Sequence, residues 1–336
     1  MRGVYLVTGI GGDLARTFAA RLWSLAGTKK VLGLAGPTGD RPAPKKVQVA
    51  EIDPRDPALV EFLEENKVDT VVHLDFLEEY RHQEEVFDRN VMGMLNVSAA
   101  AAESGARKLV LASSTWVYGA VYDNPNYLTE ARPLRGRPHL SHMKERAEVE
   151  RYAKEFVATH PRLVTTILRF APILGPSIDS PLSRYLGLPN PPAAMGFDPL
   201  LQLLHEEDAV EALIAACRAD VRGAVNVAAD GIIPLLKLLR KAGRPYLPVF
   251  HPIANLATKL APGFAAFRQM PIDVEYLRFP CVADTRRMKE ELKLTPRLGL
   301  AEIVDDWTKK RLGLVGAPSG PAEVEELQEV EEDDWW

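Results

Sequence analysis

Short apolar runs alternate with amphipathic segments along the first two thirds of the chain. Short apolar runs between turn signals are typical of buried parallel strands, and apolar positions three and four residues apart are typical of helices. The pattern predicts strands at residues 4–8, 30–34, 46–52, 70–74, 108–112 and 164–170. It predicts helices at residues 14–25, 57–66, 86–104 and 142–160. This alternation predicts βαβ units, and therefore an α/β fold with a Rossmann-type doubly wound parallel sheet.

The pattern changes after Pro172. Residues 181–199 are rich in proline, and the apolar segment 235–267 is interrupted by four prolines, which predicts short helices. Between these two segments, the chain returns to the first pattern with a helix around residues 209–216 and a short strand at 223–228. We therefore expect a Rossmann domain over residues 1–175, with 203–230 returning to it. A smaller lobe is then formed by residues 176–202 and 231–315.

Charge is distributed unevenly along the chain. The formal net charge is −5, but residues 321–336 contain eight acidic residues and no basic one, so the remainder carries +3. Such a run is typical of a solvated, disordered segment, and we expect an acidic tail over residues 316–336. Its acidic and tryptophan residues make it a candidate docking segment for a protein partner. No strong basic field favours nucleic-acid binding.

Several further classes of protein are excluded by composition. The two cysteines, Cys217 and Cys281, are far apart, which argues against a disulfide framework and a metal site. No signal-peptide pattern opens the chain. No apolar run reaches the length of about 18 residues that a membrane-spanning helix needs. The sequence therefore predicts a cytoplasmic protein without a membrane span.

A glycine-rich turn follows the first predicted strand, in the segment Val7-Thr8-Gly9-Ile10-Gly11-Gly12-Asp13-Leu14-Ala15. Glycines at such a turn permit tight backbone geometry and let a pyrophosphate approach closely. The N-terminus of the next helix then offers free N–H groups to that anion. Gly9, Gly11 and Gly12 are therefore candidate cofactor-binding residues. Asp13 would either repel the phosphates or cap the helix.

The residues expected at the adenosine end of such a cofactor are unusual. The second strand ends in Leu32-Gly33-Leu34-Ala35-Gly36, without the acid that binds the ribose of NAD. This absence favours NADP slightly over NAD, and Lys45 or Lys46 is available to a 2′-phosphate. Asp53, after the third strand, is a candidate acceptor for the adenine amino group, or alternatively a turn cap before Pro54.

Further motifs occur in a fixed order along the chain. They are Asp69-Thr70-Val71-Val72-His73-Leu74, Asn90-Val91-x-Gly93-x-x-Asn96-Val97, Ser113-Ser114-Thr115-Trp116-Val117-Tyr118-Gly119, Leu168-Arg169-Phe170-x-Pro172-x-Leu174-Gly175-Pro176, His205-Glu206-Glu207-Asp208-Ala209-Val210 and Gly223-Ala224-Val225-Asn226-Val227. With the glycine turn, this series resembles the extended short-chain dehydrogenase/reductase superfamily, also called the NAD-dependent epimerase/dehydratase family. The resemblance covers residues 4–310.

The resemblance implies site residues as well as a fold. In the family, a Ser or Thr binds the substrate oxygen, and Ser114 occupies that position. A Tyr and a Lys four residues later transfer the proton and hold the nicotinamide ribose, and a supporting Asn corresponds to Asn90. The family also has small residues close to the cofactor directly after the His-Leu pair. Leu74 and Asp75 are therefore candidate cofactor contacts, although Asp75 could equally repel the phosphates.

The Tyr-x-x-x-Lys pair itself is missing. One alignment takes Lys144 as the lysine and puts Leu140 at the tyrosine. The other, which we prefer, keeps the family's downstream Glu at Glu150 and gives His142 for Tyr and Arg146 for Lys. His142 could exchange protons near neutral pH, and Arg146 could hold ribose hydroxyls without losing its charge.

The resemblance implies an NAD(P)-dependent oxidoreductase or epimerase that acts on a carbonyl or hydroxyl of a small substrate. It also implies a homodimer. The apolar segment 235–267 favours a hydrophobic substrate, with ordinary packing between the lobes as the alternative. The competing hypothesis is a catalytically degenerate protein that binds the cofactor or acts as a scaffold through its acidic tail.

Overall fold

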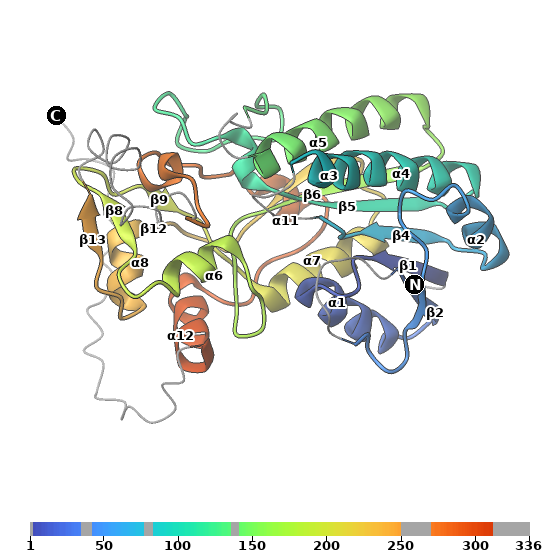
Figure 1. Cartoon of the computed structure of the whole chain (residues 1–336), viewed down its shortest axis with the longest axis horizontal. Helices are drawn as coiled ribbons and strands as arrows, with labels where there is room; N and C mark the ends of the chain where they lie inside the picture. The colour runs from blue at the N-terminus through green and yellow to red at the C-terminus, as the bar shows by residue number, and fades with distance from the viewer. Residues whose placement is uncertain (1–2, 35–41, 77–82, 136–140, 250–269, 312–336) are drawn as a thin grey trace.

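The computed structural model describes residues 3–34, 42–76, 83–135, 141–249 and 270–311, and only the backbone of 83–84, 141–142 and 310–311 (Figure 1). Ala35, Leu140 and the acidic tail therefore lie outside the described residues. Within the described part, no helix is both long and apolar enough to span a bilayer.

A parallel seven-stranded sheet forms the centre of the larger lobe, in the order β11-β6-β5-β4-β1-β2-β3. The strands are β1 Gly3–Thr8, β2 Thr28–Leu34, β3 Gln48–Ala50, β4 Thr70–His73, β5 Lys108–Ser114, β6 Val164–Phe170 and β11 Gly223–Val227. The strand order reverses between β1 and β4, both of which begin βα units. The predicted doubly wound α/β fold is confirmed.

Helices cover both faces of this sheet (Figure 1). One face carries α1 Asp13–Trp23 and α7 Glu206–Arg218, and the other carries α2 Leu59–Glu65, α3 Gln83–Phe87, α4 Gly93–Glu103 and α5 Ser141–Thr159. Side chains of a strand point to alternate faces, and β1 follows this rule. Tyr5 and Val7 are buried in the same cluster as Phe18 of α1, whereas Leu6 is buried in the cluster that contains Met94 of α4.

The helix expected at residues 86–104 is interrupted. A π-helical turn, η1 Asp88–Met92, separates α3 from α4. Such turns are rare and often lie at functional sites. Here the turn carries Arg89 and Asn90, which contact two different parts of the candidate site.

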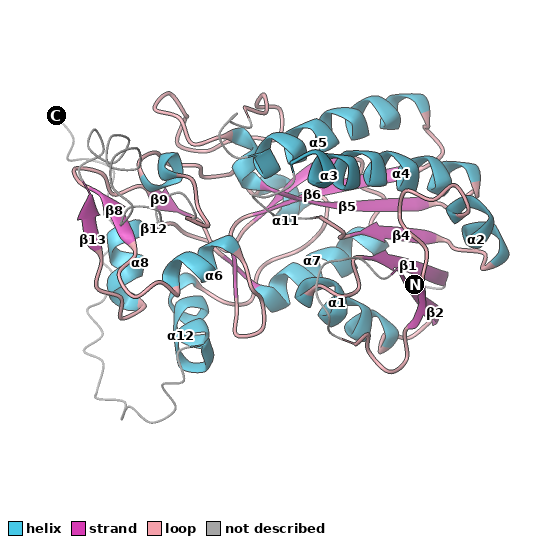
Figure 2. Cartoon of the chain, viewed as in Figure 1, coloured by secondary structure: helices cyan, strands magenta, loops and turns pink. Residues whose placement is uncertain are grey.

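The smaller lobe packs around its own apolar cluster, which includes Trp116, Tyr185, Leu238 and Trp307. Its helices and strands are α6 Pro181–Leu186, β8 Pro192–Ala194, β9 Leu200–Leu201, β12 Ile233–Pro234, α8 Leu235–Lys241, β13 Leu247–Val249, η4 Val274–Leu277 and α12 Leu300–Arg311 (Figure 2). The remaining elements are η2 Thr115–Tyr118, β7 Ile173–Leu174, β10 Leu204–His205 and α11 Arg286–Glu290.

Side chains protect the outer edge of β11, where backbone groups would otherwise be open to another strand. Glu130 accepts a hydrogen bond from Asn226 N at 2.9 Å. Arg287 donates to the carbonyl oxygens of Ala224 and Arg222. The edge is therefore lined by charged side chains rather than by a further strand.

Candidate functional site

A cleft of about 240 Å³ opens at the carboxyl end of the sheet, where the strand order reverses. This switch point is where open α/β sheets bind ligands. Gly9, Gly12, Leu74, Ser114 and Arg146 all line the cleft. The structure therefore brings residues from the glycine turn, β4, β5 and α5 to one place.

Gly9 is required by its surroundings. Its φ is +68°, and a Cβ at this position would lie 2.8 Å from the backbone N and Cα of Asp75. Gly12 precedes α1 in extended conformation and provides no side-chain cap, so the first-turn N–H groups of α1 have no cap from that residue. Gly11 is buried in the turn and is not among the residues that line the cleft.

Two carboxylates lie at the α1 side of the cleft. Asp13 Oδ2 accepts a hydrogen bond from Asp179 N at 3.3 Å, and both residues line the cleft. Asp13 thus connects α1 to the segment that leads into α6. Its negative charge nevertheless remains beside the helix N-terminus where a phosphate is expected.

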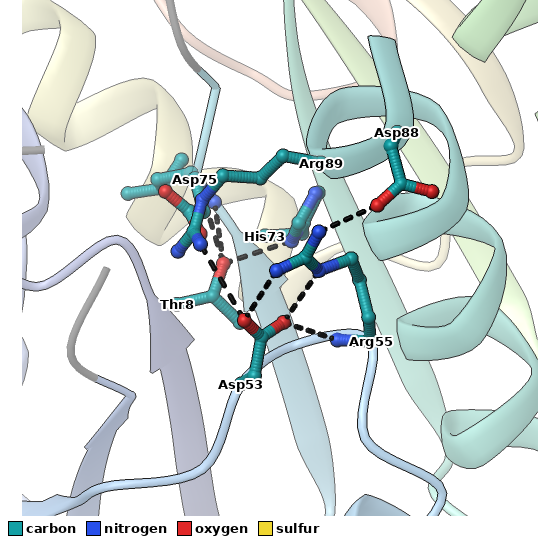
Figure 3. Close-up of polar contacts among 8 residues, drawn as sticks. Thr8, Asp53, Arg55, His73, Asp75, Asp88 and Arg89 are labelled. Carbon is teal, nitrogen blue, oxygen red and sulfur yellow. Dashed lines mark hydrogen bonds and ion pairs between the residues drawn. The ribbon is translucent and has the colours of Figure 1, made fainter. Parts of the chain in front are cut away.

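An ion-pair cluster lies at the carboxyl end of the sheet, between β3, β4 and η1 (Figure 3). It is formed by Asp53, Arg55, Asp75, Asp88 and Arg89. Arg55 donates to both carboxylate oxygens of Asp53 at 2.8 and 2.9 Å, and contacts Asp88 at 2.5 Å. Arg89 contacts Asp75 at 2.9 Å and Asp53 at 3.6 Å. The hydrogen bond from Arg55 lowers the pKa of Asp53 to about 2.

The ends of β1 and β4 are joined by Thr8. Its hydroxyl pairs with His73 Nδ1 at 2.8 Å and accepts hydrogen bonds from Leu74 N and Asp75 N at 3.1 and 3.3 Å. Burial lowers the pKa of His73 to about 4. His73 therefore has a structural position, and Asp75 is a buried carboxylate compensated by Arg89.

Ser114 and Arg146 face the cleft from two elements. Ser114 caps η2, where its Oγ accepts a hydrogen bond from Trp116 N at 3.2 Å. The guanidinium of Arg146 stacks on Phe76, 3.7 Å from the ring centroid. His142 lies in the first turn of α5, but its side chain is outside the described residues. Lys144 is exposed and lines a different cavity.

Asn90 supports α5 from beneath rather than lining the cleft. It is buried and donates to Glu145 Oε2 at 2.7 Å. Burial raises the pKa of Glu145, whereas the hydrogen bond from Asn90 acts in the opposite direction. Within the described residues, no group of His, Cys, Asp and Glu side chains is arranged to hold a metal ion.

Sequence reasoning missed three residues that shape this site: Phe76, Arg89 and Glu145. Phe76 could have been noticed, because it is a large residue in a segment where the family has small ones. No sequence signal identified Arg89 and Glu145, since their partners Asp75 and Asn90 are distant in the chain.

A model of the NAD dependent epimerase/dehydratase family matches residues 5–228, more than half of the chain. The chain belongs to this family. This member of the epimerase/dehydratase family is similar to an uncharacterized protein of Mycobacterium tuberculosis, with 32% identity over 317 residues that cover 92% of this chain and 84% of that protein. A second uncharacterized protein of that organism is 25% identical over 312 residues, which cover 92% of this chain and 30% of that protein.

Solved structures of epimerases share the fold of this epimerase/dehydratase family member. UDP-glucose 4-epimerase of Thermotoga maritima, in complex with UDP-glucose, has a TM-score of 0.73 at 17% identity and covers 92% of this chain and 99% of its own. UDP-glucose 4-epimerase of Thermus thermophilus, in complex with NAD, has a TM-score of 0.71 at 21% identity. The match covers 93% of this chain and 100% of that one. At these identities the likeness shows the fold alone.

Proposed function

We propose that this chain binds NAD in the cleft and acts as an oxidoreductase or epimerase on a carbonyl or hydroxyl carbon of a small substrate. Family membership and the NAD-bound structural neighbours support an enzyme of the NAD-dependent short-chain type. The observation that carries the proposal is the position of Ser114 and Arg146 in the same cleft as the glycine turn.

The glycine turn fits the pyrophosphate of such a cofactor. Gly9 packs directly against the backbone of Asp75, which fixes the tight geometry of the turn. Gly12 lines the cleft without a side chain, so an anion can approach the backbone closely there. The N-terminus of α1 adds N–H groups and a favourable dipole. Gly12 and Leu74 would line the bound cofactor, and Arg146 would hold the ribose next to the nicotinamide.

The chain's own residues would then handle the substrate. When bound, the nicotinamide ring supplies or accepts the hydride. The Ser114 hydroxyl would donate to the substrate oxygen, and His142 would deliver or remove the proton at that oxygen. Apolar residues such as Trp116, Met143 and Phe170 line the cleft, which supports a substrate with an apolar part.

The ion-pair cluster around Asp53 would lie next to the adenosine of the bound cofactor. Its charges support NAD rather than NADP, against the slight preference for NADP that the sequence suggested. Arg55 and Arg89 face the three carboxylates of Asp53, Asp75 and Asp88. The group therefore has a net negative charge, which repels the dianionic 2′-phosphate of NADP. We expect NADH to bind at least about ten times more tightly than NADPH, a difference of ~1.4 kcal/mol.

Titration of the purified chain with NADH and NADPH, followed by nicotinamide fluorescence, tests both parts of the cofactor proposal. If neither NADH nor NADPH binds at millimolar concentration, the cofactor proposal is refuted. Asp53→Asn and Asp88→Asn should reduce the preference for NADH, because each removes a charge that repels the 2′-phosphate. Tighter binding of NADPH by the wild-type chain would refute the charge argument alone.

Substitution of His142 tests the proton-transfer role. On a panel of ketones and sugar nucleotides, His142→Ala should reduce turnover by ~10²-fold, as expected for the loss of a general acid or base. His160→Ala is the matched control, because His160 is an exposed histidine directly after α5. Equal rates for the two variants would remove His142 from its proposed role.

One observation favours the competing function, a protein that binds the cofactor without turnover. Arg146, at the position of the family's lysine, is stacked on Phe76 and is thus already engaged by the chain. If this contact disables the site, the wild-type chain should bind NADH but turn over no substrate of the panel. Phe76→Gly should then strengthen NADH binding by releasing the guanidinium.

A further inference from the structure

A second cavity, of about 910 Å³, lies on the α5 side of the sheet. Its floor includes Ile167 and Arg169 of β6, one wall is α5, and the opposite wall is the start of β11 with Arg287. It is separate from the cleft, with which it shares no lining residue. Nothing in the proposed function uses it.

This cavity is strongly basic. Among its described lining residues, seven are Arg or Lys and three are Glu. Each glutamate already has a partner. Arg169 contacts Glu150 at 2.6 Å, Arg151 pairs with Glu148, and Glu130 accepts a hydrogen bond from a backbone N–H of β11. Arg135 and Arg287 are also paired, with Asp123 and Glu291, which lie outside the lining. The remaining excess of positive charge therefore lies on Lys144, Lys154 and Arg132.

The uncompensated charge is concentrated on α5 and on the loop of residues 130–135. Lys144 and Lys154 line the cavity, are exposed and form no ion pair with the described residues. On α5, Lys144 comes seven residues before Arg151, and Lys154 comes three residues after it. All three therefore lie on one face of the helix. The Nε of Arg132 is buried and has no hydrogen-bond partner in the described part of the chain. Such a group of cations favours a polyanionic occupant.

The chain itself supplies a segment of matching charge. Residues 321–336 contain eight carboxylates and no cation, and end in two tryptophans. The segment begins ten residues after α12 ends at Arg311. The 25 residues beyond α12 reach up to roughly 80 Å when extended, which exceeds the diameter of about 50 Å expected for a compact domain of this size. Covalent linkage also gives the segment a millimolar-scale effective concentration.

We propose that the acidic segment 321–336 binds in this basic cavity of its own chain, with its carboxylates at Lys144, Lys154 and Arg132. The association is mainly electrostatic and therefore weakens as salt shortens the Debye length. The terminal tryptophans add apolar surface and can stack on the guanidinium groups that line the walls.

Zero-length carbodiimide cross-linking of the intact chain tests this proposal, because it joins a carboxylate only to an amine in direct contact. Mass spectrometry should find Lys144 and Lys154 as the dominant partners of the carboxylates in 321–336, with a several-fold loss at about 1 M salt. Lys29 and Lys237 are exposed and lie elsewhere, so they are the matched controls. Links spread evenly over all four lysines, or no links to Lys144 and Lys154, would overturn the proposal.

Two further measurements test whether the segment binds its own chain or another copy, and whether Lys144 and Lys154 hold it there. In a mixture of ¹⁵N-labelled and unlabelled chains, each cross-link should join two peptides that are both labelled or both unlabelled. Links between a labelled and an unlabelled peptide would show that the segment binds another copy and would refute the proposal.

In intact Lys144→Gln/Lys154→Gln chains, a glutamate-specific protease should cut the segment several times faster than in Lys29→Gln/Lys237→Gln chains. Equal rates would also refute it.

Discussion

Glu150 shows how single residues of the motifs serve the fold. It is buried and accepts hydrogen bonds from Arg169 and from Ser113 Oγ, while Arg169 also donates to Tyr118 Oη at 2.7 Å. Tyr118 in turn donates to Asn226 of β11. Buried ion pairs need such additional hydrogen bonds to offset the loss of hydration. The motif residues thus connect β5, β6, α5 and β11 behind the cleft.

A pH dependence is expected from His73. Its pKa is about 4 in the folded chain because of burial, compared with 6.5 when exposed; Asp75 raises and Arg89 lowers it to smaller extents. The unfolded chain therefore binds a proton first as the pH falls. The contribution of neutral, buried His73 to the free energy of unfolding is fully present above pH 6.5. It is lost as the pH falls toward 4, by an amount on the order of 3 kcal/mol.

Urea unfolding at a series of pH values, compared with His73→Asn, measures this contribution. The variant should be less stable at pH 7, because it loses the contact with Thr8, but its free energy of unfolding should fall less between pH 6.5 and 4. The same slope in both chains would contradict the assignment.

At the scale of elements, the meeting of two strand ends defines the site. The turn after β1 passes so close to the end of β4 that only a residue without a Cβ fits at Gly9. The π-helical turn η1 then places Arg89 against Asp75 at the end of β4 and Asn90 against Glu145 of α5. One π-helical turn therefore supports both the end of β4 and α5 at the cleft.

Alanine substitution of two glycines separates backbone strain from steric conflict. Gly105 has a φ of +75° with open space around its Cβ position, so Gly105→Ala should cost only the conformational strain, ~1–2 kcal/mol. Gly9→Ala adds a conflict with the backbone of Asp75 and should cost more, with a loss of NADH affinity of at least about tenfold. Denaturant unfolding and NADH titration measure both effects, and equal stability losses would contradict the close approach.

At the scale of the whole molecule, the start of α7 connects the two lobes. Asp208 is buried and accepts hydrogen bonds from the backbone N–H groups of Arg297 and Leu298 at 3.0 and 3.4 Å. His205 caps α7 through Nδ1 and contacts Asp306 of α12 at 3.1 Å through Nε2. The segment that leads into α12 is therefore held against the Rossmann domain.

Removal of this connection should destabilise the chain. Asp208→Ala leaves two backbone N–H groups without their acceptor, which costs ~1–3 kcal/mol. Asp305→Ala on α12 is the control. Among the described residues, Asp305 forms only a partly exposed ion pair with Lys241, so this variant should lose at most ~1 kcal/mol. Thermal unfolding of the two variants measures the difference; equal losses would show that Asp208 does not join the lobes.

Local patterns were sufficient to predict the architecture. The strand at residues 164–170 has the predicted bounds, and the alternation of strands and helices defined the doubly wound sheet. The glycine turn and Ser114 were found from their motifs and line the cleft in the structure. Such features depend on neighbours within a few residues, so the sequence alone determines them.

Contacts between distant segments were decided only by the tertiary structure. The helix pattern at 86–104 did not show the π-helical turn, and nothing in the sequence paired Arg89 with Asp75 or Asn90 with Glu145. The stacking of Arg146 on Phe76 depends on how α5 packs over β5 and β6. The sequence by itself thus determined the fold and the position of the glycine turn. Packing of remote elements decided which charges are compensated and which side chains reach the cleft, because those contacts have no local periodic signal.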